Sequence, residues 1–384
     1  MGSGIFRFMK FGVALLLAAA AALMVASCSD SSTSTDLNNR LERAVDEAMS
    51  IYGIPGAIVG VWCPRCGETI LVKGKGDVET GADVEIGDRV RICSITKTFT
   101  VTVVLQLVDE GRLGLEDRLA GFYPDIPNAD HITIRQLCNM TAGLFSYDED
   151  ETFIRTFTED PDKVWEPAEL VALAVAHPPY FPPGEGWHYS NTNAIILGMI
   201  VEKITGKDIA SEIRSRLVDG LTLTDTCYPE ETGIEGAHMH GYVGGEGEEL
   251  TDATYLFNPS GMGASGAMIS SLFDMKAWVA ALADGDLLTD ETQSQRTTFV
   301  PGDYAYFGIP VKYGLGILSC RGFLGHPGDG FGYTNAAFHS PDTGTTIVVF
   351  LNKAPNEGAF MALTLFEQLA EIMKDEDLLV QNSA

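Results

Sequence analysis

The sequence is short of basic residues. Its 384 residues include 25 Lys and Arg against 53 Asp and Glu, which gives a formal net charge of −28. Such a negative field repels nucleic acid and anionic lipid surfaces, so we expect no nucleic-acid partner. It disfavours anionic substrates only weakly, because salt screens surface charge within about 8–10 Å. The composition is 45% hydrophobic, which is ample for a large globular core.

The sequence also lacks an apolar run long enough for an ordinary membrane-spanning helix. The longest run, residues 11–25, follows Arg7 and Lys10. It is shorter than the roughly 20 residues that a spanning helix needs, and a basic start before a short apolar stretch is typical of a signal peptide. We therefore expect an exported protein.

The end of this run predicts a lipid anchor. Val25-Ala-Ser-Cys28 resembles a bacterial lipobox, in which the cysteine is linked to diacylglycerol and becomes the first residue after cleavage. Two or more acyl chains give stable membrane attachment. We expect residues 1–27 to be a lipoprotein signal peptide, Cys28 to carry the anchor at the bacterial cell membrane, and residues 28–36 to be a flexible tether. An uncleaved anchor and a plain secretory signal are the alternatives.

The cysteine count argues against a metal site. Cys63-Pro-Arg-Cys66 has the spacing of a zinc or redox motif, but no second cysteine pair completes a metal site. The motif lies between two strand-like runs, so we expect a hairpin turn closed by a local disulfide, with two free thiols as the next alternative. His238-Met-His240 has no carboxylate cluster beside it. We expect neither a metal nor a cofactor.

Periodicity and turn residues divide the chain into helical and strand-like segments. No internal repeat is present. The helical pattern covers residues 37–52, 94–107, 191–204, 271–283 and 357–374. The strand pattern covers residues 57–62, 69–73, 313–320, 323–327, 333–339 and 345–351.

This order predicts an α+β fold with an antiparallel sheet flanked by helices. Strands lie near both ends, and the middle is helical. We expect the sheet domain to comprise residues 37–93 and 300–372, with a helical insertion over residues 95–290. Residues 373–384 form an acidic tail.

A Ser-x-x-Lys sequence opens one of the predicted helices. Ser94 and Lys97 share a helix face, so the lysine amine can reach the serine hydroxyl. A lysine acts as a base only where burial or neighbouring cations lower its pKa. Taken alone, the pattern also fits a helix-capping serine with a solvated lysine.

Two further motifs favour catalysis. Tyr189-Ser-Asn191 opens another predicted helix, and His326-Pro-Gly328 lies on a strand before Asp329. In this order the motifs resemble those of the class C β-lactamase and D-alanyl-D-alanine carboxypeptidase family, and the likeness covers residues 37–372. A second Tyr-x-Asn begins at Tyr333, but it follows the third motif on a strand, so we choose Tyr189.

The resemblance implies a β-lactamase/transpeptidase-like fold and a role for each motif residue. Ser94 would be the acylated nucleophile, and Lys97 and Tyr189 would move protons; which of the two is the base in acylation stays open. Asn191 would hold Lys97 and the substrate amide. His326, Gly328 and Asp329 would line the substrate site. His326 would support Tyr189, and the backbone N–H groups of Ser94 and Asp329 would form an oxyanion hole.

The resemblance also implies a serine hydrolase acting on a small peptide, ester or β-lactam. We expect a carboxypeptidase-like enzyme on cell-wall peptides, with a broad esterase or D-peptidase as the alternative. Pro327 stands where many members have a threonine that binds the substrate carboxylate, and Asp329 adds negative charge, so an efficient β-lactamase is disfavoured. A non-catalytic surface binding protein is the alternative of another class. Residues 145–165 and 246–259 are expected to help select the substrate.

Overall fold

The computed structural model describes residues 36–244, 249–354, 360–376 and 378–379 of the chain. The expected signal peptide, the expected lipidation site Cys28 and almost all of the tether lie outside these residues, as does half of the expected acidic tail. Among the helices described, none is both long and apolar enough to cross a membrane.

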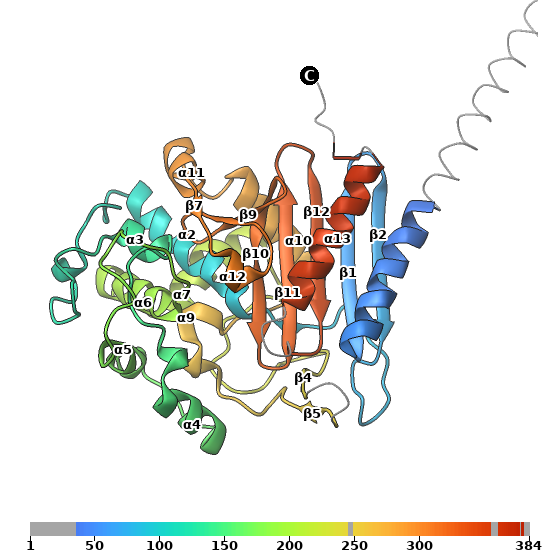
Figure 1. The fold of residues 1–384 in the computed structure, drawn as a ribbon, viewed down its shortest axis with the longest axis horizontal. Coiled ribbons are helices and arrows are strands. Elements are labelled where there is room, and N and C mark those ends of the chain that lie inside the picture. Colours follow the sequence, from blue (N-terminus) through green and yellow to red (C-terminus); the bar gives the residue numbers. More distant parts are fainter. Residues whose placement is uncertain (1–35, 245–248, 355–359, 377, 380–384) are drawn as a thin grey trace, which may run out of the picture.

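An eight-stranded antiparallel sheet forms the centre of the molecule (Figure 1). The strand order is β2-β1-β12-β11-β10-β9-β8-β7, so the first two strands of the chain join the last strand at one side of the sheet. This closure brings together segments almost 300 residues apart. The strands are β1 Gly56–Cys63, β2 Gly67–Gly74, β7 Val300–Pro301, β8 Lys312–Tyr313, β9 Leu318–Cys320, β10 Phe323–Gly330, β11 Tyr333–Ser340 and β12 Thr345–Leu351.

The central strands are buried on both faces, which explains their nearly continuous apolar sequences. In β1 every residue is buried. Val59 and Val61 pack into one core, whereas Ile58 and Trp62 pack into the other, as the alternation of side chains along a strand requires. The sheet therefore separates two hydrophobic cores.

Helices cover both faces of the sheet. The first helix, residues 36–52, and α13 (Met361–Asp375) share one core with β1 and β12 and lie over the same face (Figure 1). On the other face α10 (Leu272–Asp284) contacts β10, β11 and β12. The sequence predicts this helix within the helical insertion over residues 95–290, whereas in the structure it packs on the sheet.

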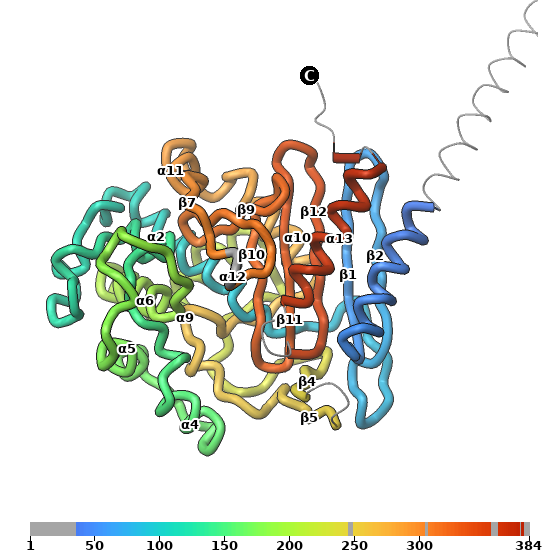
Figure 2. The backbone as a smooth tube through the Cα atoms, viewed as in Figure 1, coloured from blue at the N-terminus to red at the C-terminus, as the bar shows by residue number. Residues whose placement is uncertain are grey.

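Most of the remaining helices pack to one side of the sheet (Figure 1), and the tube in Figure 2 shows the chain leaving the sheet after β2 and returning through β7. In this part α2 contacts α6, α7 and α9. Its α-helices are α2 Thr96–Asp109, α3 Ile134–Cys138, α4 Glu151–Glu159, α5 Pro167–Val175, α6 Asn191–Thr205, α7 Ile209–Ile213, α8 Asp219–Leu221 and α9 Gly263–Gly266, and α11 Asp290–Arg296 and α12 Tyr304–Phe307 follow α10. The α+β class is confirmed.

Two local predictions differ from the structure. The expected strand over residues 313–320 is broken into β8 and β9, because Gly316 takes a φ of +63° and its N–H donates to the Cys138 carbonyl. The expected β1–β2 hairpin is present, but Cys63 and Cys66 are free thiols in place of the expected disulfide.

Candidate active site

Ser94 lies at the junction of the sheet and the helical part. It is the middle residue of a short 3-10 helix, Cys93–Ile95, that leads directly into α2 and contacts β10. Cys93 has a φ of +50°, a conformation that few residues other than glycine adopt. The chain therefore turns sharply before the serine, which sets the hydroxyl at the start of a buried helix.

Lys97 lies one turn further along and is buried beside the serine. Its Nζ atom is 3.0 Å from Ser94 Oγ and 2.8 Å from the Ser265 carbonyl oxygen. Burial lowers the pKa of Lys97 to about 7, and the negative charge of Asp148 opposes that shift. A large share of the lysine is therefore neutral at physiological pH, and a neutral amine at this distance can accept the serine proton.

The ring of Tyr189 packs over the amine of Lys97, whose Nζ atom is 4.8 Å from the ring centroid. Tyr189 lies two residues before α6 and is buried. Within the described part of the chain its hydroxyl has no hydrogen-bond partner. Burial raises the pKa of this hydroxyl well above its usual value, and the nearby Ser94 partly lowers it. The hydroxyl is thus protonated and unpaired next to the serine.

Asn191, the first residue of α6, binds a carboxylate that the motifs did not predict. Its Nδ2 donates to Asp148 Oδ2 at 2.8 Å, and its backbone N–H donates to Ser146 Oγ at 2.9 Å. The Ser146 hydroxyl also donates to Asp148. Asn191 was expected to hold Lys97, but the Lys97 amine donates to the Ser265 carbonyl oxygen instead. The Oδ1 atom of Asn191 has no partner among the described residues, so it can accept from a substrate N–H.

The third motif lies on β10 and presses against the serine turn. A Cβ atom on Gly328 would lie 2.2 Å from the Ile92 carbonyl oxygen and 3.1 Å from the Ser94 nitrogen. Only glycine allows the strand to approach this closely. This approach places β10, with Asp329 directly after Gly328, beside the backbone of Ser94. The two N–H groups expected to form the oxyanion hole belong to Ser94 and Asp329.

His326 is buried on the same strand and is neutral. Its Nε2 lies 3.0 Å from the Tyr313 hydroxyl, and its Nδ1 lies 2.5 Å from the Pro327 carbonyl oxygen. Burial lowers the pKa of His326 to about 3, and the charge of Lys97 adds to the shift. The ring centroids of His326 and Tyr189 are 6.1 Å apart. A neutral histidine offers the substrate no positive charge.

Asp329 follows on β10, and the hydroxyl of Thr334 donates to it across the hairpin. Burial raises the pKa of Asp329 to about 7. The carboxyl is therefore only partly ionised at neutral pH, and the full charge that the sequence suggested appears only above that pH.

The structure brings the three motifs together and adds residues that sequence reasoning missed. Asp148, the Ser265 carbonyl and Tyr313 all contact motif residues. Tyr313 carried a signal, because the segment Tyr313-Gly-Leu-Gly316 that it begins also resembles the family. Ser265 acts through its backbone and Asp148 lies in a single-turn 3-10 helix, Tyr147–Glu149, so neither has a residue pattern of its own.

The second Tyr-x-Asn sequence has a structural place in the fold. The Tyr333 hydroxyl donates to the Met239 carbonyl oxygen at 2.7 Å. Asn335 donates to the carbonyl oxygens of Arg91 and Gly328 at 3.0 and 3.2 Å. These bonds fix β11 against the serine turn, and Tyr189 is the tyrosine beside Lys97.

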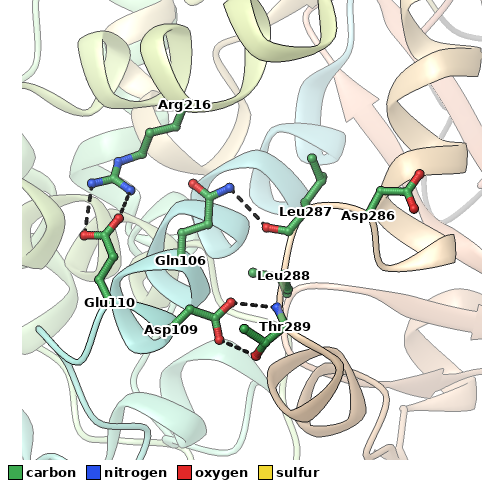
Figure 3. Close-up of a pocket in the computed structure, with 8 residues that line it drawn as sticks. All are labelled: Gln106, Asp109, Glu110, Arg216, Asp286, Leu287, Leu288 and Thr289. Atoms are coloured by element: carbon green, nitrogen blue, oxygen red, sulfur yellow. Dashed lines mark hydrogen bonds and ion pairs between the residues drawn. The ribbon is translucent and has the colours of Figure 1, made fainter.

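A separate groove lies at the far end of α2 from Lys97 (Figure 3). Several of its polar side chains bond to one another. Glu110 pairs with Arg216 at 2.5 Å, and Asp109 accepts from the Thr289 hydroxyl at 2.6 Å. We therefore do not assign catalysis to it. Within the described ranges no group of three or more His, Cys, Asp or Glu is placed to hold a metal ion.

Comparison with known proteins agrees with this geometry. The family model described as Beta-lactamase matches residues 41–371. A D-aminopeptidase of Cereibacter sphaeroides is 27% identical over 335 residues, covering 81% of this chain and 59% of the relative. The chain thus spans less than two thirds of the length of that relative.

Two solved structures resemble the chain over nearly their whole length. A D-stereospecific amidohydrolase from a Streptomyces species has a TM-score of 0.76 and 32% identity, covering 87% of this chain and 97% of the other. A D-amino acid amidase from Ochrobactrum anthropi, in complex with L-phenylalanine amide, has a TM-score of 0.78 and 26% identity, covering 89% and 99%.

Proposed function

The chain belongs to the β-lactamase family of serine hydrolases, and from this premise we propose that it hydrolyses small amides or peptides of D-amino acids that carry a free amino group. Ser94 attacks the carbonyl carbon while neutral Lys97 takes its proton. The leaving amine receives a proton from Tyr189. Tyr189 then takes a proton from the water that attacks the acyl carbon, and Lys97 returns its proton to Ser94 as the acyl group leaves. Asn191 accepts from the substrate amide through Oδ1.

The charge distribution of the site carries the substrate assignment. The Asp148 carboxylate lies close enough to Lys97 to raise its pKa, whereas His326 is held neutral by burial. Pro327 has no hydroxyl for a substrate carboxylate, and Asp329 becomes negative above pH 7. A site of this sign favours a substrate ammonium over a terminal carboxylate. The names of the relatives, D-aminopeptidase and D-amino acid amidase, support the same choice.

This proposal shifts the expected substrate from the carboxypeptidase type to the aminopeptidase or amidase type. Both types use the same acyl-enzyme chemistry at Ser94, so the difference lies in which end of the substrate is charged. The expected export and lipid anchor at Cys28 remain part of the proposal, and would bring the enzyme close to peptides that contain D-amino acids.

Two measurements test the proposal. First, intact-mass analysis with a fluorophosphonate should show one adduct, which is absent from Ser94→Ala. Second, the p-nitroanilide of D-alanine should be hydrolysed with a kcat/KM about 10–100-fold higher than its N-acetyl derivative, because acetylation removes a charged hydrogen-bonding group. Asp148→Asn should reduce this preference.

The two measurements fail differently. If folded protein gives no adduct, the serine-nucleophile assignment is wrong and a non-catalytic binding protein becomes the better description. If the adduct forms but the N-acetyl substrate reacts equally well, the amino-group assignment alone is wrong. Cleavage of a peptide ending in D-Ala-D-Ala in that case would restore the carboxypeptidase interpretation.

A further inference from the structure

The turn between β1 and β2 holds two thiols that the proposed reaction does not use. The Cys66 N–H donates to the Cys63 carbonyl oxygen at 3.2 Å, and Gly67 takes a φ of +84°. Pro64 occupies the position of the turn that proline favours. The first and fourth residues of such a turn have Cα atoms less than about 7 Å apart, which is close to the range that a disulfide spans.

The two thiols differ in access to solvent. Cys63 is 4% exposed and faces the core, whereas Cys66 is half-buried. The buried Thr345 hydroxyl lies on the neighbouring strand β12 and has no hydrogen-bond partner in the described part of the chain. An unpaired buried hydroxyl is costly unless a second group approaches it. Here the nearby group is the sulfur of Cys63.

The surroundings of Cys63 stabilise a thiolate. A hydrogen bond from the Cys66 thiol lowers the pKa of Cys63, and the backbone N–H groups of Arg65 and Cys66 and the Thr345 hydroxyl lower it further. The same pairing and burial raise the pKa of Cys66. The inner sulfur is therefore the thiolate of the reduced pair, and the outer sulfur is the one that reagents reach.

We propose that Cys63 and Cys66 form a thiol–disulfide exchange site, whose substrates are the disulfides of low-molecular-weight thiols and whose product is an intrachain disulfide. Cys66 loses its proton to solvent and attacks one sulfur of the reagent disulfide, and the first small thiolate leaves. The Cys63 thiolate then attacks the Cys66 sulfur of the mixed disulfide and displaces the second small thiolate. Both leaving thiolates take up protons, and the reagent gains the two electrons that the protein sulfurs lose.

This site is separate from the candidate active site. Asp329 pairs with Thr334, Thr334 with Leu351 and Leu351 with Ala57 across the sheet. Cys63 lies further along β1 from Ala57, a displacement of about 20 Å at 3.3 Å per residue. Closure of the turn should therefore leave labelling of Ser94 unchanged.

Thiol mapping of the full chain tests the proposal. The reduced protein is equilibrated with mixtures of glutathione and glutathione disulfide, its remaining thiols are alkylated, and peptides are identified by mass. Cys63 and Cys66 should become protected together in one two-electron transition, with the loss of two hydrogens and no glutathione adduct. The exposed Cys227 is the internal control and should form only a mixed disulfide with glutathione.

Two variants sharpen the result. Cys63→Ser should trap a stable glutathione adduct on Cys66, because the resolving thiolate is missing. Thr345→Val should slow closure several-fold at pH 7, since the thiolate loses one donor. A stable adduct on Cys66 in the wild-type chain, or two thiols that stay free in the most oxidising mixture, would overturn the proposal. Circular dichroism should be used to check that each variant is folded, and labelling of Ser94 in the same samples keeps failure here distinct from failure of the hydrolase assignment.

Discussion

The amine of Lys97 lies 3.0 Å from the hydroxyl oxygen of Ser94, one helical turn away and out of contact with bulk water. Both acceptors of this amine, Ser94 Oγ and the Ser265 carbonyl, are neutral. Neutral acceptors compensate a buried ammonium poorly, which is why burial lowers the pKa of Lys97 to about 7 despite the charge of Asp148.

This relationship predicts the pH dependence of serine acylation. The reactive form of Lys97 is the neutral amine, so the rate of labelling by a neutral fluorophosphonate should rise with pH and reach half its limit near pH 7. Asp148→Asn removes a charge that favours the ammonium, so the half-point should move to lower pH. Glu149→Gln is the matched control: Glu149 accepts from Tyr180, and its removal should leave the half-point in place. A half-point near pH 10 would contradict the assignment of Lys97 as the base.

Arginine at position 97 gives an independent check on the same assignment. Lys97→Arg keeps a positive charge but cannot lose its proton in the accessible pH range. Labelling of Ser94 should fall by a factor of about 10²–10⁴, which is typical for the loss of a general base. If Lys97→Arg is labelled at the wild-type rate, Lys97 positions the serine without taking its proton.

The two Tyr-x-Asn sequences should respond oppositely to loss of the tyrosine hydroxyl. The Tyr189 hydroxyl is buried without a partner in the described residues, so Tyr189→Phe should be neutral or stabilising by up to about 1 kcal/mol while kcat falls about 10²–10⁴-fold. Tyr333→Phe removes a 2.7 Å hydrogen bond to the Met239 carbonyl oxygen and leaves that oxygen without this donor. Stability should therefore fall by about 1–2 kcal/mol with little change in kcat.

Urea unfolding and steady-state kinetics on both variants check this contrast. Both changes remove one oxygen from a buried ring of the same type, so packing loss is similar and the difference isolates the role of each hydroxyl. A kcat unaffected by Tyr189→Phe would remove Tyr189 from the proton transfers, and an inactive but stable Tyr333→Phe would mean that the wrong motif was chosen.

The sequence predicted the contacts of the site that join residues close together in the chain. The spacing of Ser94 and Lys97 sets their contact because positions three apart share a helix face, and the structure gives that contact. The contact between Asn191 and Asp148 joins residues 43 apart through the packing of the 3-10 helix Tyr147–Glu149 against α6. No periodicity reports such a contact. Sequence could therefore supply the motif residues but not the charge that surrounds them.

The same limit applies to the fold. Residues 345–351 were predicted as a strand and form β12 with those bounds, because a buried strand has a continuous apolar sequence. A helix was also predicted over residues 271–283, and α10 is observed there, but its apolar pattern did not say which layer it covers. Its packing on β10, β11 and β12 is decided by the sheet, whose strand order joins the two ends of the chain.

Gly328 should tolerate no side chain. Gly328→Ala places a methyl group 2.2 Å from the Ile92 carbonyl oxygen, so β10 must move away from the serine turn. We expect kcat to fall about 10²–10³-fold, as when an oxyanion-hole donor is lost, and stability to fall by about 1–3 kcal/mol from overpacking. Gly121→Ala is the control, since nothing lies within 4 Å of its added Cβ. Kinetics and urea unfolding check both, and an active Gly328→Ala would contradict the close approach.

His326 should make the protein sensitive to mild acid. Its pKa in the folded state, about 3, lies below its ordinary value of 6.5, so the unfolded chain binds a proton first as pH falls. The stability that depends on the neutral ring is complete above pH 6.5 and is lost progressively from there toward pH 3, by about 1.4 kcal/mol per pH unit.

Urea unfolding of wild type and His326→Gln at pH 7 and pH 5.5 measures this term. His326→Gln should differ from the wild type in stability at pH 7, because the packing and the bond to Tyr313 change. The stability that it loses between pH 7 and pH 5.5 should nevertheless be smaller than the wild-type loss. His131, whose side chain is 71% exposed, provides the control, and His131→Gln should retain the wild-type pH dependence. Equal losses in all three proteins would mean that His326 is protonated without cost, and the site would then carry the positive charge that favours a substrate carboxylate.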